Sequence, residues 1–146
     1  MTNSITEILK TAKINVAPET FAIVSLTGED WNTVLADPEA SPRMSVPFMI
    51  FKDRFETTLV LDEIDLASLR SAAGSARIEN GFRLLTFDVE LDFSVTGFIA
   101  EISRVLAEAK IPIVAVSSFS RDHLLIRQND LASALRALGP VVDEVC

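Results

Sequence analysis

The chain has 146 residues, 49% of them apolar and 23% charged, a composition typical of a globular protein with room for one ordinary domain or two very small ones. Its formal net charge of −8 repels phosphate backbones and argues against nucleic-acid binding. The single cysteine excludes an intrachain disulfide. Because the sequence has neither a long apolar run nor a basic N-terminal region, we expect no membrane span and a cytoplasmic location.

The N-terminal segment, residues 1–17, predicts a short helix. Ser4 and Glu7 have the spacing of a capping box, in which a hydroxyl and a carboxylate satisfy N–H groups at the start of a helix. Apolar residues then recur at helical spacing, so we expect a helix over residues 4–14. A β-rich apolar run over residues 21–26 predicts the first strand.

The segment after this strand favours irregular structure. Residues 30–35 can form one or two helical turns, but Pro38 and Pro42 prevent a longer helix, because each removes a backbone donor and clashes with the preceding turn. We therefore expect the first half of the chain to lack a proper first helix. The apolar pattern further predicts strands over residues 46–51 and 55–61 and a helix over 63–73.

Asn80-Gly81 is typical of a turn and predicts the boundary between two halves. After it, apolar residues alternate with polar ones from Leu85 to Leu91, as in a strand with one buried face. A helical pattern follows over residues 98–110. Further elements are expected at residues 111–116 and 122–126 (strands), from Asn129 or Asp130 (a helix) and at 141–145 (a short strand). The order βαββα(β) predicts a ferredoxin-like module.

The two halves match without gaps at an offset of 65 residues, strand on strand and helix on helix. The sequence Asp-Leu-Ala-Ser, for example, begins at Asp65 and again at Asp130. The copies are unequal, because Asn32 stands at the position that corresponds to Gly97. A function that needs the loop before the long helix is therefore expected in the second copy.

Two stretches of the second half resemble the ACT domain. Residues 81–97, GFRLLTFDVELDFSVTG, are similar to its first strand and the loop that follows. Residues 111–126, IPIVAVSSFSRDHLLI, are similar to the branch of small tandem-ACT bacterial proteins related to cytosolic arginine sensors, although His123 stands where that branch often has an aromatic residue. The resemblance is strong over residues 81–138 and weaker over 18–74.

The resemblance implies an α+β fold class, with two ferredoxin-like (βαββαβ) ACT-type units whose antiparallel sheets carry helices on one face. The units are a degenerate ACT-like unit over residues 18–78 and a complete one over 79–146. The resemblance also implies regulatory binding of a small molecule, an amino acid above all, without catalysis and without a cofactor. Since ACT units commonly associate side by side, within or between chains, we expect a homodimer.

Ligands of ACT domains lie against the loop between the first strand and the first helix, which implies a site in the second unit. The implied residues are Asp92, Phe93, Ser94, Val95, Thr96 and Gly97, with Val114, Ala115, Val116, Ser117 and Asp122 as weaker candidates. The chemistry agrees, because a helix start offers N–H groups to a carboxylate, and Asp122 at the end of an inward strand face suits an ammonium group. The alternatives are that Ser94 and Thr96 serve only as helix caps and that Asp122 only begins a strand.

Other site classes are not expected from the residue types. Asp122 points to the opposite strand face from its neighbour His123, the only histidine, so no catalytic triad forms. One histidine, one terminal cysteine and no spaced acidic cluster do not make a metal site, and the few glycines form no phosphate loop. The competing hypothesis is a structural or protein-interaction module that has lost ligand binding.

Overall fold

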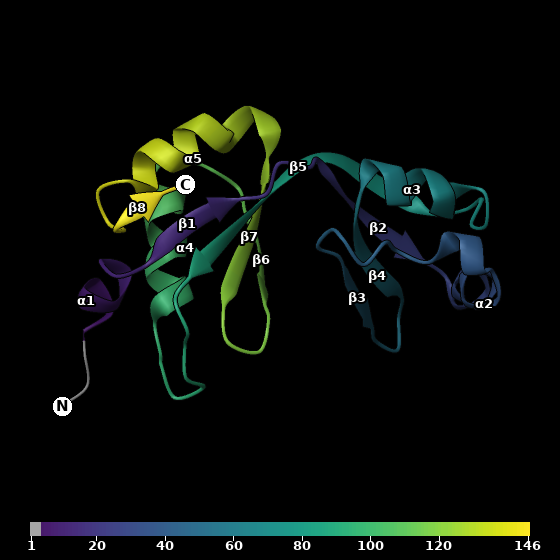
Figure 1. Cartoon of the computed structure of the whole chain (residues 1–146), viewed down its shortest axis with the longest axis horizontal. Coiled ribbons are helices and arrows are strands. Elements are labelled where there is room, and N and C mark those ends of the chain that lie inside the picture. Colours follow the sequence, from purple (N-terminus) through teal and green to yellow (C-terminus); the bar gives the residue numbers. More distant parts are fainter. Residues whose placement is uncertain (1–3) are drawn as a thin grey trace. The chain divides into compact units, whose positions relative to one another are not determined.

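The computed structural model describes residues 4–146, which form two compact units (Figure 1). The middle unit is Glu19–Phe82, and the composite unit joins the described residues up to Pro18 to Arg83–Cys146. Residues 1–3 of the expected N-terminal segment lie outside the described residues. Strand β5 (Arg77–Asp88) contributes its first half to the middle unit and its second half to the composite unit.

The middle unit has the order βαββαβ of a ferredoxin-like fold. Before β5 its elements are β2 (Phe21–Leu26), α2 (Gly28–Ala36), β3 (Met49–Lys52), β4 (Thr57–Asp62) and α3 (Glu63–Arg70). The sheet is antiparallel, with the strand order β3-β4-β2-β5. Val34 of α2 and Leu69 of α3 share one buried core with Val24 and Leu59 of the strands, so both helices cover the same face.

The composite unit is a second ferredoxin-like arrangement, in which a strand from the N-terminal segment takes one of the places in the sheet. Its elements are α1 (Ile5–Leu9), β1 (Lys13–Val16), the end of β5, α4 (Phe98–Glu108), β6 (Val114–Ser117), β7 (Asp122–Arg127), α5 (Leu131–Leu138) and β8 (Glu144–Val145). The strand order is β6-β7-β5-β1-β8, so β1 occupies the place beside β5 that the fourth strand of the module normally takes. The expected α+β class with two ferredoxin-like units is confirmed.

The predicted helix over residues 4–14 is wrong in its second half. Ser4 caps α1 as expected, accepting a hydrogen bond from the Glu7 N–H at 3.2 Å, but the helix ends at Leu9. Lys13–Val16 instead pairs antiparallel with β5 and parallel with β8, which sets Ile14 opposite Phe87 in the core. The sheet pairing overrides the local helical spacing, as tertiary contacts commonly do.

The predicted turn at Asn80-Gly81 is also wrong, because β5 runs straight through it. Gly81 has a φ of +84°, which glycine adopts without strain. The register with β2 shifts at this point, from Ile23 opposite Glu79 to Phe21 opposite Phe82. This is the geometry of a β-bulge, so the glycine marks an extra residue in a continuous strand.

The expectation that the first half lacks a proper first helix is contradicted by α2. Thr27 caps this helix, accepting a hydrogen bond from the Asp30 N–H at 3.2 Å. The helix ends at Ala36, and the extended Asp37 and then Pro38 follow, because a proline removes a backbone donor and clashes with the preceding turn. Asn32 lies inside α2, so it is not the structural counterpart of Gly97.

The two copies differ chiefly in the loop before the first helix. The offset of 65 residues holds for the hairpin strands, since β3 begins at Met49 and β6 at Val114, and β4 at Thr57 and β7 at Asp122. It fails at the helices, because Thr27 alone joins β2 to α2 whereas residues 89–97 join β5 to α4. The composite unit therefore has a long loop at this position, and the middle unit does not.

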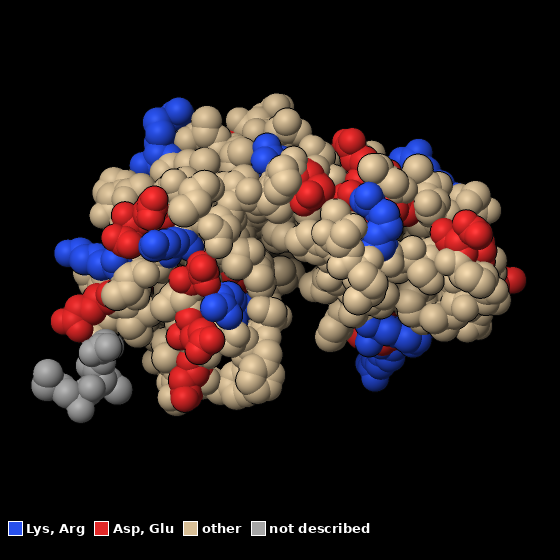
Figure 2. All heavy atoms as spheres, in the orientation of Figure 1, with Lys and Arg blue, Asp and Glu red and all other residues tan. Residues whose placement is uncertain are grey.

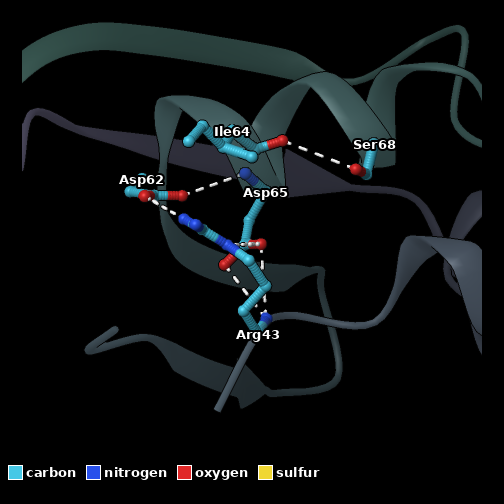
Figure 3. Close-up of polar contacts among 5 residues, drawn as sticks. All are labelled: Arg43, Asp62, Ile64, Asp65 and Ser68. Carbon is cyan, nitrogen blue, oxygen red and sulfur yellow. Dashed lines mark hydrogen bonds and ion pairs between the residues drawn. The ribbon is translucent and has the colours of Figure 1, made fainter. Parts of the chain in front are cut away.

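An ion-paired cluster fixes the start of α3 in the middle unit. The Arg43 guanidinium lies between the carboxylates of Asp62 and Asp65, with its Nε 3.0 Å from Asp65 Oδ1 and its Nη2 on Asp62 (Figure 3). Asp62 Oδ1 also accepts from the Asp65 N–H at 2.9 Å and so caps the helix. Both carboxylates are buried, and their pairing with Arg43 ties the loop before β3 to the helix.

Candidate functional site

A pocket of about 210 Å³ lies in the composite unit, where the loop before α4 meets the turn between β6 and β7. Its lining consists of Leu91, Asp92, Phe93, Val95, Gly97, Phe98, Ile99, Ser117, Ser118, Phe119, Ser120, Arg121 and Asp122. The pocket thus has an apolar wall from the loop and helix and a polar wall from the hairpin.

The loop wall is shaped by Asp92. Its Oδ1 accepts hydrogen bonds from the N–H and the hydroxyl of Ser94, both at 2.8 Å, and its carbonyl accepts from the Val95 N–H at 2.9 Å. The backbone N–H bond from Ser94, followed by the hydroxyl bond, lowers the pKa of Asp92 from its ordinary value. The carboxylate therefore stays charged and holds the loop in a tight turn.

Gly97 ends the loop and begins α4. Its φ of +86° lies in the left-handed region that favours glycine, and its carbonyl accepts from the Glu101 N–H at 3.0 Å. No side chain among the described residues caps this helix, so neither Ser94 nor Thr96 is a cap. The N–H groups that precede Glu101 in the first turn have no partner within the helix and suit an anion.

The position of α4 is fixed by the core beneath it. Phe98, Ile102 and Leu106 recur at intervals of four residues and are all buried against the sheet. The Phe98 ring meets the Phe87 ring edge to face, with the ring centroids 5.6 Å apart. Burial of such a side chain stabilises the fold by roughly 1.5–3 kcal/mol, so the start of the helix is rigidly held over the end of β5.

The polar wall is the β6–β7 hairpin. Its turn is closed by a hydrogen bond from the Ser118 N–H to the Arg121 carbonyl at 2.9 Å. Asp122 lies on the strand face of the buried Leu124 and Ile126, and its Oδ1 accepts from the Ser117 hydroxyl at 2.5 Å. One carboxylate oxygen of Asp122 is thus engaged at the pocket wall.

Two contacts join the loop to the hairpin. The Leu91 N–H donates to the Ser120 carbonyl at 2.7 Å. The rings of Phe93 and Phe119 meet edge to face at 5.0 Å, although the two residues are 78% and 83% exposed. Large aromatic side chains normally bury 150–250 Å², so this exposed pair leaves apolar surface at the pocket rim.

The charge of the pocket is set by two acids and one base. Arg121 directs its Nε to Asp88 Oδ1 at 2.9 Å, and its guanidinium lies 4.0 Å from Glu90. The guanidinium is therefore already paired with carboxylates at the end of β5. Asp92 and Asp122 remain as the acids of the lining, which favours a positively charged group in the ligand.

The structure brings together six of the residues that the sequence nominates: Asp92, Phe93, Val95, Gly97, Ser117 and Asp122. Ser94 and Thr96 lie in the same loop outside the lining, and Val114, Ala115 and Val116 extend along β6 away from it. The turn 118–121 also lines the pocket, although none of its residues is among those nominated from the sequence. A phenylalanine among serines between two predicted strands was a usable signal, because a turn has no structural need for an aromatic side chain.

His123 lies on the other face of β7 and is held between two hydroxyls. Its Nδ1 is 2.9 Å from Thr86 Oγ1, and its Nε2 is 2.8 Å from Ser118 Oγ. Burial lowers the pKa of His123, Arg121 lowers it further, and Asp122 opposes both. In a catalytic triad a carboxylate holds the second ring nitrogen of the histidine, but here the Thr86 hydroxyl takes that place. A hydroxyl cannot stabilise an imidazolium as a carboxylate does.

Residues 4–146 contain no group of three histidine, cysteine or acidic side chains placed to hold a metal ion. Within the same residues, no helix combines the length and the apolar character that crossing a bilayer requires.

Residues 77–139, which include the whole pocket lining, match the family model of the ACT domain. The chain is similar to a solved structure from Agrobacterium tumefaciens at 21% identity and a TM-score of 0.73, covering 93% of this chain and 92% of that one. It is also similar to a protein from Vibrio cholerae (19%, TM-score 0.64, covering 92% and 93%). A third similar structure is the ligand-free regulatory subunit of aspartate kinase from Thermus thermophilus (13%, 0.63, 91% and 98%). No curated protein matches the sequence.

Proposed function

We propose that this chain is a non-catalytic regulatory protein that binds a small molecule, an amino acid above all, in the pocket of the composite unit. The observation that carries the proposal is the meeting of a helix start, two acids and an apolar wall in one pocket of about 210 Å³. Residues 77–139 match the ACT domain, and the aspartate kinase relative is a regulatory subunit, which supports a regulatory role.

The two ends of an amino acid have complementary partners in this pocket. The first turn of α4 offers N–H groups and the positive end of the helix dipole to the carboxylate. Asp122 offers a carboxylate to the ammonium, across the pocket on the hairpin wall. Leu91, Val95 and Ile99 leave an apolar surface for the ligand's side chain.

One ligand per chain follows from the unequal loops. In the middle unit Thr27 alone lies between β2 and α2, and its hydroxyl is engaged as the helix cap. The loop of residues 89–97 gives the composite unit its pocket wall. We therefore propose that residues 18–78 belong to an ACT-like unit without a ligand, and that residues 79–146, whose sheet is completed by β1, carry the ligand-binding one.

The resemblance to small tandem-ACT proteins related to cytosolic arginine sensors supports two further parts of the proposal. The protein acts in the cytoplasm, and it forms a homodimer by pairing of ACT-type units. Its partners are then a small ligand and a second copy, without nucleic acid, because the net charge of −8 repels phosphates.

A thermal-shift panel of free amino acids tests the function. Ligand at about 100 times its dissociation constant stabilises a fold by roughly 2.7 kcal/mol, or roughly 5–10 °C in Tm at about 2–4 °C per kcal/mol. We expect a shift of this size with at least one amino acid. If none shifts the Tm, the amino-acid proposal fails and the protein-interaction module becomes the better account.

A further inference from the structure

His123 connects the pocket turn, residues 118–121, to strand β5. It lies opposite Val116 in the β6–β7 hairpin, half-buried, and it is not itself part of the pocket lining. Its Nδ1 is 2.9 Å from the Thr86 hydroxyl of β5, and its Nε2 is 2.8 Å from the Ser118 hydroxyl of the turn. The ring therefore bridges two hydroxyls, one on the sheet and one at the pocket.

The second hydrogen bond of Ser118 determines which ring nitrogen carries the hydrogen. The Ser118 hydroxyl donates to the Arg121 carbonyl at 3.1 Å, and a carbonyl can only accept. The oxygen of that hydroxyl then accepts from the Nε2–H of His123. Nδ1 is left without a hydrogen, so it accepts from the Thr86 hydroxyl. This assignment uses each donor once, and it requires a neutral imidazole.

The chain of hydrogen bonds ends at the pocket, because Ser118 and Arg121 both belong to its lining. The Ser118 N–H donates to the same Arg121 carbonyl at 2.9 Å, so the turn closes on one acceptor. The Leu91 N–H and an ion pair between Arg121 and Asp88 also hold the turn. Since the side chains of that ion pair are partly exposed, it contributes little, and the histidine bridge becomes more important.

Protonation of His123 breaks this chain of hydrogen bonds. An imidazolium has two N–H donors and no acceptor, so the Thr86 hydroxyl loses its partner. The new charge also lies in a half-buried position, where desolvation disfavours it. Burial accordingly lowers the pKa of His123 from its ordinary value of about 6.5. The ring is therefore neutral at pH 7 and becomes charged only in more acidic solution.

Few charges face the ring. Besides burial, Asp122 raises and Arg121 lowers the pKa of His123. On β5 the nearest carboxylates are Asp88 and Glu90, which lie beside the Arg121 guanidinium. Residues 111–120, which include β6 and most of the turn, contain no charged side chain. In Figure 2 the tip of the β6–β7 hairpin is accordingly tan, and charged side chains gather around the end of β5.

We propose that neutral His123 is the positioning residue of the pocket turn, and that its protonation releases the turn and weakens ligand binding. The first part concerns the free protein, and the second rests on the function proposed above. A released turn moves Ser118 out of the lining and separates Phe119 from Phe93 at the rim. The site then binds its ligand less tightly as the pH falls.

NMR of the free protein tests the first part, because the only histidine gives a single set of ring signals. The nitrogen-15 shifts should place the hydrogen on Nε2. The protection of the Ser118 amide against hydrogen exchange should fall as the pH passes through the pKa of His123. A hydrogen on Nδ1, or a protection factor that does not change through that pKa, overturns the positioning role.

A matched pair of threonine variants supports the same measurement. Thr86→Val keeps the shape of the side chain but removes the hydroxyl, so protection of the Ser118 amide at pH 7.5 should fall by about 2- to 12-fold. Thr58→Val, at a half-buried strand threonine of the middle unit, should leave it unchanged. Equal protection in the two variants contradicts the bridge through His123.

Calorimetry at two pH values tests the second part, with the amino acid that gives the largest thermal shift. The Kd of the wild type should rise about 3-fold or more between pH 7.5 and pH 5, and saturation with ligand should lower the pKa of His123 by about half a unit or more, since the coupling is reciprocal. His123→Gln, whose amide donates to Ser118 but does not titrate, should bind as the wild type does at pH 7.5 and lose this pH dependence.

The same pH dependence in His123→Gln, or an unchanged Kd in the wild type, overturns the second part. If no amino acid binds, the proposed function fails and the second part fails with it. The NMR measurements on the free protein still decide the first part, so the two failures are distinguishable.

Discussion

Phe93 and Phe119 come from separate elements, a loop before a helix and a hairpin turn, and their exposed rings meet edge to face with centroids 5.0 Å apart. Each ring lines the pocket. The contact closes the rim between the two walls, so a ligand that enters the pocket meets aromatic surface that is otherwise left in water.

Phe119→Ala should weaken amino-acid binding by roughly 2- to 10-fold, because a ligand that covers about 20–50 Å² of the ring loses roughly 0.5–1.3 kcal/mol at about 25 cal/mol per Å². The fold itself should be little affected, since the ring is exposed. Calorimetric titration measures the affinity. The control is Phe55→Ala, at a phenylalanine of the middle unit that is similarly exposed (75%, against 83% for Phe119). Equal affinity in the wild type and Phe119→Ala would remove the pair from the site.

Asp122→Asn should weaken binding by roughly 10- to 150-fold. A hydrogen bond to a charged group contributes about 1.5–3 kcal/mol, and the amide keeps the shape but loses the charge that an ammonium needs. Asp143→Asn, at an exposed position near the C-terminus, is the matched control. Titration of both variants decides the role of Asp122, which is refuted by an affinity equal to that of the control.

Gly97→Ala should lower the melting temperature by about 2–8 °C. The left-handed φ of +86° costs an L-residue roughly 1–2 kcal/mol, and a chain of this length loses about 2–4 °C per kcal/mol. Space is not the cause, because the nearest atom to an added Cβ, Ile5 Cγ1, is at an ordinary 3.6 Å. Gly74→Ala is the control, since nothing lies within 4 Å of its added Cβ. Similar melting temperatures for the two variants would show that strain at Gly97 is negligible.

Stability should fall on acidification partly because of Asp62. Burial acts to raise the pKa of this carboxyl, but the Asp65 N–H and the Arg43 guanidinium outweigh it, and the pKa is lower than in the unfolded chain. A lowered pKa stabilises the fold above the unfolded value of about 3.9, and this contribution is lost as the pH falls through the folded pKa. Asp62→Asn should therefore lose less stability than the wild type between pH 5 and pH 2, measured by urea unfolding. Parallel pH profiles would refute this role of Asp62.

Much of the fold could be predicted from the sequence, because the apolar residues that recur at helix or strand spacing are the ones that the fold buries. The helix over residues 98–110 and the strands around 111–126 appear within a few residues of their expected bounds. The failures occur where distant contacts decide. Residues 13–16 become a strand because β5 and β8 flank them, and Asn80-Gly81 becomes a bulge because β2 continues on both sides.

The candidate site was predicted in part for a similar reason. The loop from Asp92 to Gly97 could be identified by its resemblance to ACT domains and by the helix that follows. The aromatic Phe119 among serines signalled a function for the turn, but the place of Phe119 and Arg121 in the pocket could not be predicted, because it depends on how the hairpin turn folds back to the Leu91 backbone. The first helices of the two units do not follow the offset of 65 residues, because the loops before them differ in length. A comparison of the two halves without gaps cannot detect such a difference in loop length.

The most direct test of the central claim is the stoichiometry of binding. Isothermal titration of the wild type, with the amino acid that gives the largest thermal shift, should give one site per chain. The loop of residues 89–97 forms a pocket wall in the composite unit, whereas the equivalent loop of the middle unit is the single residue Thr27. The same titration of Asp122→Asn should show the single site weakened. Two equivalent sites per chain, or a single site unaffected by the substitution, would contradict the assignment of the ligand to the composite unit.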